Sequence, residues 1–289
     1  METSELLKKV RKIEIKTKGL SSQIFSGEYQ SAFKGRGMSF SEVRPYHYGD
    51  DVRNIDWNVT ARTGDAHVKV FEEERELTLM LLVDISASQA FGTSQESKNE
   101  VVTLISAVLA FSATNNNDKV GCIFFTDRIE KFIPPKKGKQ HILRIIRELL
   151  DYEPEGKKTS LKVALEYLNN VIKKKCITFI LSDFVSENYD NALKITARRH
   201  DVIGIHMYDQ TEKELPNVGM IRTYDMETGE EKIIDTSSKT VRQKHTDIFE
   251  NNFNYFTSNF NKCGADYISL ETNESYVNAL LKFFKKRTR

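Results

Sequence analysis

The stretch from Leu77 to Ser88, LTLMLLVDISAS, decides the fold of this chain. Its apolar run, which ends at Val83 and is broken by a single threonine, is far shorter than the roughly 20 residues of a membrane helix and predicts a buried strand. Asp84, Ser86 and a second serine follow at alternate positions. In open α/β sheets, ligands bind outside the carboxyl ends of the strands, so this is where a polar cluster would bind a ligand.

Strand and helix patterns alternate after this stretch. We predict helices over 96–114, 140–150, 160–174, 189–199, 237–261 and 275–286, and strands over 77–85, 119–126, 176–181, 202–207 and 266–270. Residues 128–133 predict an antiparallel edge strand, and 220–235 predict a β-hairpin around Thr228-Gly229. The fold class is therefore α/β: a doubly wound, mostly parallel sheet of Rossmann type, with helices on both faces.

The first quarter of the chain has a different pattern. Residues 4–18 predict a short amphipathic helix, with Ser4 as its cap and Gly19 after its end. Residues 27–74 are rich in Gly, Arg, Asp and aromatic residues, and predict loops, short strands and a helical turn near 54–60. We therefore expect a small, irregular, β-containing N-terminal segment, 1–75, packed on a main domain, 76–289.

Composition excludes several classes of protein. The 43 Lys and Arg against 41 Asp and Glu leave a net charge of +2, which disfavours nucleic acid as a partner. The charged N-terminus lacks the apolar core of a signal peptide, and no apolar run could insert stably in a membrane, so we expect a cytoplasmic protein. Cys122, Cys176 and Cys263 are odd in number and widely spaced, which predicts buried thiols.

Two further residues extend the polar cluster. Thr159, in GKKTSLKVAL, opens a predicted helix, and Asp183, in FILSDF, ends an apolar strand in the same register as Asp84. We expect the two aspartates on neighbouring strand ends, with the threonine between them. Carboxylate and hydroxyl oxygens suit Mg²⁺ or Mn²⁺, so the candidate metal ligands are Asp84, Ser86, Ser88, Thr159 and Asp183. The alternative for the two serines is that they cap the following helix.

This set resembles the metal-ion-dependent adhesion site of von Willebrand factor A-like domains. The resemblance implies that Ser86, Ser88 and Thr159 bind the metal directly or nearly so, and that the aspartates act largely through water. It also implies one open coordination position for an acidic side chain of a partner. Gln89 departs from the methionine that the family often has there, and Ser182 is a further ligand in some geometries.

The segment upstream narrows the resemblance. It reads GRGMSFSEVRPYHYGDDVRNIDWNVTARTGDAHVKVFEEERE over residues 35–76. Together with LLVDISAS it is similar to a bacterial family of von Willebrand A-like proteins associated with MoxR-type AAA+ ATPases, a domain of unknown function, DUF58. The resemblance covers residues 9–184. It implies a MoxR-type ATPase as partner, possible contacts with further von Willebrand A-like proteins, and a role in assembling or activating protein complexes.

The same segment offers candidate partner-binding residues. Its aspartates and arginines alternate beside aromatic residues. This pattern predicts a platform of charge pairs whose side chains form hydrogen bonds with the N–H and C=O groups of the irregular backbone. The alternative is a docking surface for the ATPase, because tryptophan and arginine dominate binding hot spots. The candidates are Arg44, Arg53, Trp57 and Arg62.

The chain lacks the signatures of several enzymes. It has no G-x-x-x-x-G-K-[ST] loop, no G-x-S-x-G elbow and no H-E-x-x-H pair. We therefore expect a non-enzymatic, divalent-cation-dependent interaction module. The alternative is a metal-dependent hydrolase, which needs a general base, and we expect no histidine near the strand-end loops.

Overall fold

The computed structural model describes residues 8, 10–14, 17, 29, 38–73, 77–90, 97–224 and 231–288. The chain divides into two compact units, one formed by Met1–Ala32 with Thr78–Arg289 and the other by Phe33–Leu77. The first 32 residues thus group with the sheet. The prediction had grouped them with the segment that follows, in one N-terminal segment, 1–75. Tyr29 illustrates the reason, because its ring is fully buried and meets the ring of Phe284 edge-on at 6.2 Å. Packing of residues 33–77 on the main unit stays a prediction.

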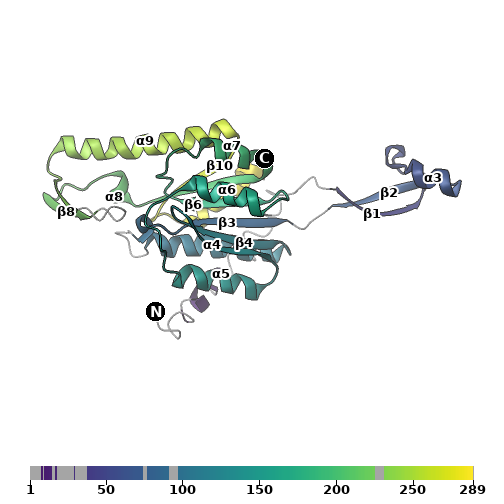
Figure 1. Cartoon of the computed structure of the whole chain (residues 1–289), viewed down its shortest axis with the longest axis horizontal. Helices are drawn as coiled ribbons and strands as arrows, with labels where there is room; N and C mark the ends of the chain where they lie inside the picture. The colour runs from purple at the N-terminus through teal and green to yellow at the C-terminus, as the bar shows by residue number, and fades with distance from the viewer. Residues whose placement is uncertain are drawn as a thin grey trace. The chain divides into compact units, whose positions relative to one another are not determined.

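A six-stranded sheet forms the centre of the larger unit (Figure 1). Its order is β10-β7-β6-β3-β4-β5, and all neighbours are parallel except β4 and β5. The strands are β3 (Thr78–Asp84), β4 (Lys119–Phe125), β5 (Ile129–Lys136), β6 (Ile177–Ser182), β7 (Asp201–Tyr208) and β10 (Asp266–Glu271). The predicted mostly parallel sheet, with an antiparallel edge after residue 128, is confirmed.

Helices cover both faces of this sheet (Figure 1). They are α4 (Lys98–Asn115), α5 (Lys139–Asp151), α6 (Leu161–Val171), α7 (Asp190–Arg199), α8 (Gln210–Lys213), α9 (Lys239–Cys263) and α10 (Tyr276–Thr288). Met80 and Leu82 of β3 pack in one apolar cluster with residues of α6, α7 and α9. Alternate residues of a strand point to opposite faces, so Leu79, Leu81 and Val83 face α4. Because both faces are covered, β3 is apolar throughout and buried.

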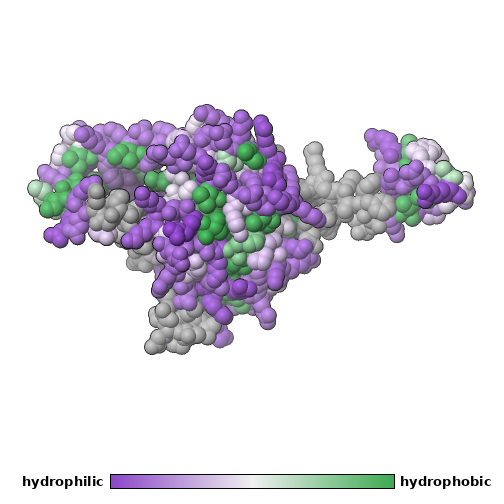
Figure 2. Space-filling model, in the orientation of Figure 1, coloured by the Kyte–Doolittle hydropathy of each residue, from purple (hydrophilic) through white to green (hydrophobic). Residues whose placement is uncertain are grey.

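A two-stranded hairpin leaves the main sheet between α8 and α9. β8 (Met220–Tyr224) and β9 (Glu231–Asp235) pair antiparallel as predicted, and the expected turn at Thr228-Gly229 lies outside the described residues. Met220 and Ile233 on these strands are 74% and 72% exposed, and Figure 2 shows apolar atoms at the surface where Figure 1 places β8.

The unit Phe33–Leu77 is built on β1 (Met38–Pro45) and β2 (His67–Glu73), which pair antiparallel. Between them lie the 3-10 turn η2 (Val52–Asn54) and α3 (Trp57–Thr63), close to the predicted helical turn. Asp56 caps α3 by accepting from the backbone N–H groups of Asn58 and Val59.

Other predictions for the chain have mixed outcomes. The described residues of the predicted opening helix are helical, but its cap Ser4 lies outside the described part. Cys122 and Cys176 are buried free thiols as expected, whereas Cys263, at the end of α9, is only half-buried, so the prediction was wrong there. Among the described residues, no helix is both long and apolar enough to cross a bilayer.

Candidate metal centre

The candidate site lies at the carboxyl ends of β3 and β6, which are parallel neighbours. Val83 pairs with Leu181, so the residue opposite Asp84 is Ser182, and Asp183 follows one residue beyond the strand. The prediction that the two aspartates share a register was therefore wrong by one residue. The shift lets the Ser182 hydroxyl donate a 2.6 Å hydrogen bond to Asp84 Oδ2.

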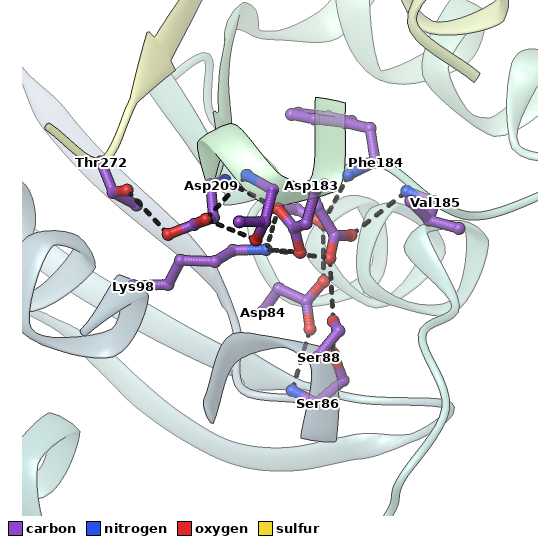
Figure 3. Close-up of polar contacts among 12 residues, drawn as sticks. Asp84, Ser86, Ser88, Lys98, Asp183, Phe184, Val185, Asp209 and Thr272 are labelled. Atoms are coloured by element: carbon purple, nitrogen blue, oxygen red, sulfur yellow. Dashed lines mark hydrogen bonds and ion pairs between the residues drawn. The ribbon is translucent and has the colours of Figure 1, made fainter. Parts of the chain in front are cut away.

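Five side chains converge there, as predicted, and Figure 3 shows four of them, Asp84, Ser86, Ser88 and Asp183. Thr159 Oγ1 donates to Ser86 Oγ at 2.8 Å and approaches Asp84 Oδ2 at 3.4 Å. Ser86 Oγ lies 3.1 Å from Ser88 Oγ, which donates to Asp183 Oδ2 at 2.8 Å. We call the side-chain oxygens of these five residues the oxygen ring. Thr159 lies beside Asp84 and Ser86. The expectation that it lies between the two aspartates was wrong.

The serines do not cap α4, the helix that was predicted to follow them. α4 begins at Lys98, and its cap is Ser97, whose side chain accepts from the N–H of Glu100. Ser86 instead donates its backbone N–H to Asp84 Oδ1 at 3.0 Å. This local bond curls the chain directly after β3 and turns the serine hydroxyls toward the loop of Thr159.

The loop that carries Thr159 is held from two sides. The N–H of Ala87 donates to the Lys157 carbonyl at 3.2 Å, and the N–H of Ser160 donates to the Thr126 carbonyl at 2.9 Å. Gly156 packs so tightly that a Cβ there would lie 2.1 Å from Thr126 Oγ1. The position of Thr159 is thus set by the segment after β3 and by the turn after β4.

The charges of the site are buried. Asp84 and Asp183 are 1% and 7% exposed. Burial and the nearby charge of Asp183 raise the pKa of Asp84 well above its usual range. Two acids that share a buried place disfavour double ionisation, and a bound cation would relieve this.

Sequence reasoning missed a buried lysine at this site. Lys98, the first residue of α4, has a fully buried side chain whose Nζ lies 3.5 Å from Asp183 Oδ2 and 2.9 Å from Glu212 Oε1. Burial lowers the pKa of Lys98, but the charges of Asp183 and Glu212 outweigh this, and the net pKa is raised. Glu212 belongs to α8, where its side chain also accepts from the backbone N–H of Asp209.

A histidine also lies closer than predicted. His206 of β7 pairs with Ser182 of β6 in the parallel register. Its ring stacks on Phe256 with centroids 5.4 Å apart, and its Nδ1 lies 3.0 Å from Ser269 Oγ. Burial lowers its pKa to about 4, so the ring is neutral near pH 7. The expectation of no nearby histidine was therefore wrong. The sequence pattern did not reveal His206 because this residue lies within an apolar strand.

The spacing within the oxygen ring fits a small divalent cation. Adjacent ligands of an octahedral Mg²⁺ at about 2.1 Å from the ion lie roughly 3.0 Å apart. The distances Thr159–Ser86 and Ser86–Ser88 are 2.8 and 3.1 Å. Three of the five residues of the oxygen ring, Ser86, Ser88 and Thr159, contribute hydroxyl oxygens. Among the described residues, no three His, Cys, Asp or Glu side chains form a metal cluster.

Comparison with known proteins assigns the family. The family model for "Protein of unknown function DUF58" matches residues 42–252. The chain belongs to the DUF58 family. An uncharacterized protein of Mycobacterium tuberculosis is 27% identical to this DUF58 protein, with 100% of this chain and 92% of the relative covered.

Solved structures agree with the fold. An aerotolerance-related membrane protein of Bacteroides fragilis matches with a TM-score of 0.50 and 15% identity, over 73% of this chain and 98% of its own. A proximal thread matrix protein of the mussel byssus, solved with a zinc-occupied MIDAS motif, matches at a TM-score of 0.38 and 18% identity, over 46% of this chain and 38% of its own. The first likeness supports the fold alone.

The four candidate partner-binding residues differ in their surroundings. Arg44 forms a two-pronged ion pair with Asp50 at 2.7 and 2.8 Å, and this hydrogen bonding lowers the pKa of Asp50 to about 2. Arg53 pairs with Asp51 at 2.8 Å. Arg62 is exposed, and Trp57 is 70% exposed. The arginine pairs therefore fit the charge-paired platform, whereas Trp57 remains available to a partner.

Proposed function

We propose that this DUF58 protein is a divalent-cation-dependent protein interaction module. The observation that carries the proposal is the oxygen ring, in which three hydroxyls and two buried carboxylates from separate loops lie at ligand spacing. Mg²⁺ or Mn²⁺ is the expected cation, because such ions prefer hard oxygen ligands.

The donor set explains why binding of a partner would need the cation. Ser86, Ser88 and Thr159 would hold it with neutral hydroxyls, and Asp84 and Asp183 would balance its charge. A cation with so few direct carboxylate ligands stays electrophilic and attracts a further anion. We therefore expect an acidic side chain of a partner to complete the site.

The proposed partner is a MoxR-type AAA+ ATPase, with further von Willebrand A-like proteins as additional partners, acting in the cytoplasm. The family resemblance supports the ATPase, and the exposed Trp57 supplies a second contact of the kind found in binding hot spots. Assembly or activation of protein complexes is the role that this partnership implies.

The hydrolase alternative receives less support. The register brings His206 beside Ser182, but burial lowers the pKa of His206 to about 4, which makes it a weak base, and its Nδ1 is bonded to Ser269 within an aromatic cluster. A general base must reach the proton that it abstracts, and the described hydrogen bond and ring contacts of His206 are to Ser269 and to aromatic side chains.

Calorimetry with Mg²⁺ and Mn²⁺ tests the metal site directly. We expect binding to wild type and loss of binding in Asp84→Ala, with the fold retained. Ser112→Ala is a matched control, since it removes a buried hydroxyl that donates within α4, to the Val108 carbonyl. Equal affinity in wild type and Asp84→Ala would overturn the assignment.

A pull-down from the native cytoplasm, with and without chelator, tests the partner. We expect the ATPase to be recovered with Mg²⁺ present and lost with chelator. Its absence under both conditions would contradict the partner proposal and leave the metal site intact.

A further inference from the structure

The cluster around the oxygen ring already contains a fixed positive charge. The Lys98 side chain is fully buried, and its ammonium group contacts Asp183 (Figure 3) and Glu212. A buried ammonium cannot turn away into water, so its charge acts on the site at all times. Ser97 and Glu100 at the start of the same helix are bonded to each other, so the lysine is fixed on a capped turn.

Lys98 is shared unequally between its two carboxylates. Its Nζ lies 2.9 and 3.2 Å from the two oxygens of Glu212, but 3.5 Å from Asp183 Oδ2. Asp183 has other donors that hold it in place, namely the Ser88 hydroxyl at 2.8 Å and the Val185 N–H at 3.2 Å. The lysine is therefore not needed to position Asp183, and its main influence on the oxygen ring is its charge.

We propose that Lys98 is a built-in competitor of the metal, which weakens cation binding at the oxygen ring, while Glu212 limits this effect by drawing the ammonium group toward α8. The inference rests on the proposed function, because it concerns the same site. Like charges a few ångström apart repel strongly in a partly screened interior. The site would thus bind a cation weakly alone and tightly when a partner carboxylate adds negative charge, so that metal and partner bind cooperatively.

Three variants distinguish an effect of the Lys98 charge on metal binding from a purely structural role of Lys98. Lys98→Met removes the competing charge and is expected to tighten Mn²⁺ binding about tenfold or more. Glu212→Gln removes the competing attraction and is expected to weaken Mn²⁺ binding by a similar factor. The double variant restores the local charge and should return close to wild-type affinity. A lysine with only a structural role would give weaker binding in Lys98→Met and the weakest in the double variant.

Calorimetric titration with Mn²⁺ alone measures these affinities, and circular dichroism checks that each variant folds. Glu214→Gln is the matched control, because it removes the same charge from an exposed position two residues away. If Lys98→Met fails to fold, Glu212→Gln decides alone, and wild-type affinity in that variant overturns the inference.

The two proposals fail in different ways. If wild type binds Mn²⁺ and folded Lys98→Met binds it no more tightly, Lys98 is not a competitor, but the metal site stands. If neither wild type nor any variant binds Mn²⁺, the proposed function fails, and this inference fails with it.

Discussion

Ser182 and Asp84 are 98 residues apart in sequence, yet the serine hydroxyl donates a 2.6 Å hydrogen bond to Asp84 Oδ2. The parallel pairing of β6 with β3 places the two residues opposite each other. The other oxygen of the carboxylate, Oδ1, accepts from the N–H of Ser86. Asp84 is thus aimed by one donor from its own loop and one from the neighbouring strand.

Ser182→Ala should therefore damage both the fold and the site. A buried carboxylate that loses a donor costs about 1–3 kcal/mol of unfolding free energy. We also expect Mn²⁺ affinity to fall several-fold, because Asp84 loses the bond that orients it. Urea unfolding and calorimetry measure the two effects. Unchanged affinity would show that the Asp84 side chain is oriented without Ser182.

Gly156→Ala should displace the loop of Thr159. The added Cβ would lie 2.1 Å from Thr126 Oγ1 and 2.3 Å from Asp127 Oδ1, so either the loop or these side chains must shift. Overpacking of this kind costs about 1–3 kcal/mol. We expect weaker Mn²⁺ binding in calorimetry because one hydroxyl of the oxygen ring moves.

Gly138→Ala controls for a general loss of stability. Gly138 has a φ of +99° and open space around its Cβ position, so alanine there is strained but far from Thr159 in the sequence. It should lower the unfolding free energy without changing Mn²⁺ affinity. Equal affinity losses in both glycine variants would contradict the positioning role of Gly156.

The pH dependence of stability should change in His200→Gln. Burial, and then the charge of Arg199, lower the pKa of His200 to about 4, against roughly 6.5 in an unfolded chain. Between these values the unfolded state binds the proton first, so stability is lost as the pH falls from about 6.5 toward 4. His206 acts with the same sign and Asp84 with the opposite one, so wild type alone does not isolate this effect.

Comparison of the His200→Gln variant with wild type isolates the contribution of His200 to the pH dependence of stability. Between pH 7.5 and 5, wild type should lose up to about 2 kcal/mol relative to His200→Gln. Urea unfolding at several pH values measures the difference. A constant difference across this range would show that His200 titrates normally in the folded chain.

Trp57 offers a direct optical test of the partner surface. It is the single tryptophan of the chain and is 70% exposed. Its fluorescence should therefore be quenched readily by acrylamide. Binding of a purified MoxR-type ATPase should shift the emission to shorter wavelength and protect the ring from quenching, because a hot-spot residue is desolvated on binding.

A matched variant separates the two surfaces. Trp57→Ala should weaken ATPase binding at least tenfold while leaving Mn²⁺ affinity unchanged. Unaltered ATPase affinity would exclude Trp57 from the interface without bearing on the oxygen ring.

Sequence patterns were sufficient to predict the sheet and the convergence of the five candidate side chains. Each ligand follows an apolar strand or precedes a helix, and such positions converge whenever parallel strands are neighbours. The register of β6 against β3 was harder to predict. The sequence of an apolar strand does not indicate whether Ser182 or Asp183 lies opposite Asp84.

Lys98 and Glu212 left no comparable signal. Their contact joins residues 114 positions apart, and a lysine at the start of a helix is normally solvated. Tyr29 was missed for a related reason. Its buried contact with Phe284 ties the beginning of the larger unit to its last helix, and no local pattern encodes that pairing.

The oxygen ring draws its atoms from three pieces of chain, residues 84–88, 159 and 183. None of these pieces holds the arrangement alone, since each is kept in place by hydrogen bonds to another piece. The ring therefore exists only while the sheet is assembled, and it disappears as a whole when the sheet melts. Cation affinity would serve as a gauge of intact tertiary structure in this protein, falling whenever the contacts among these three pieces are lost.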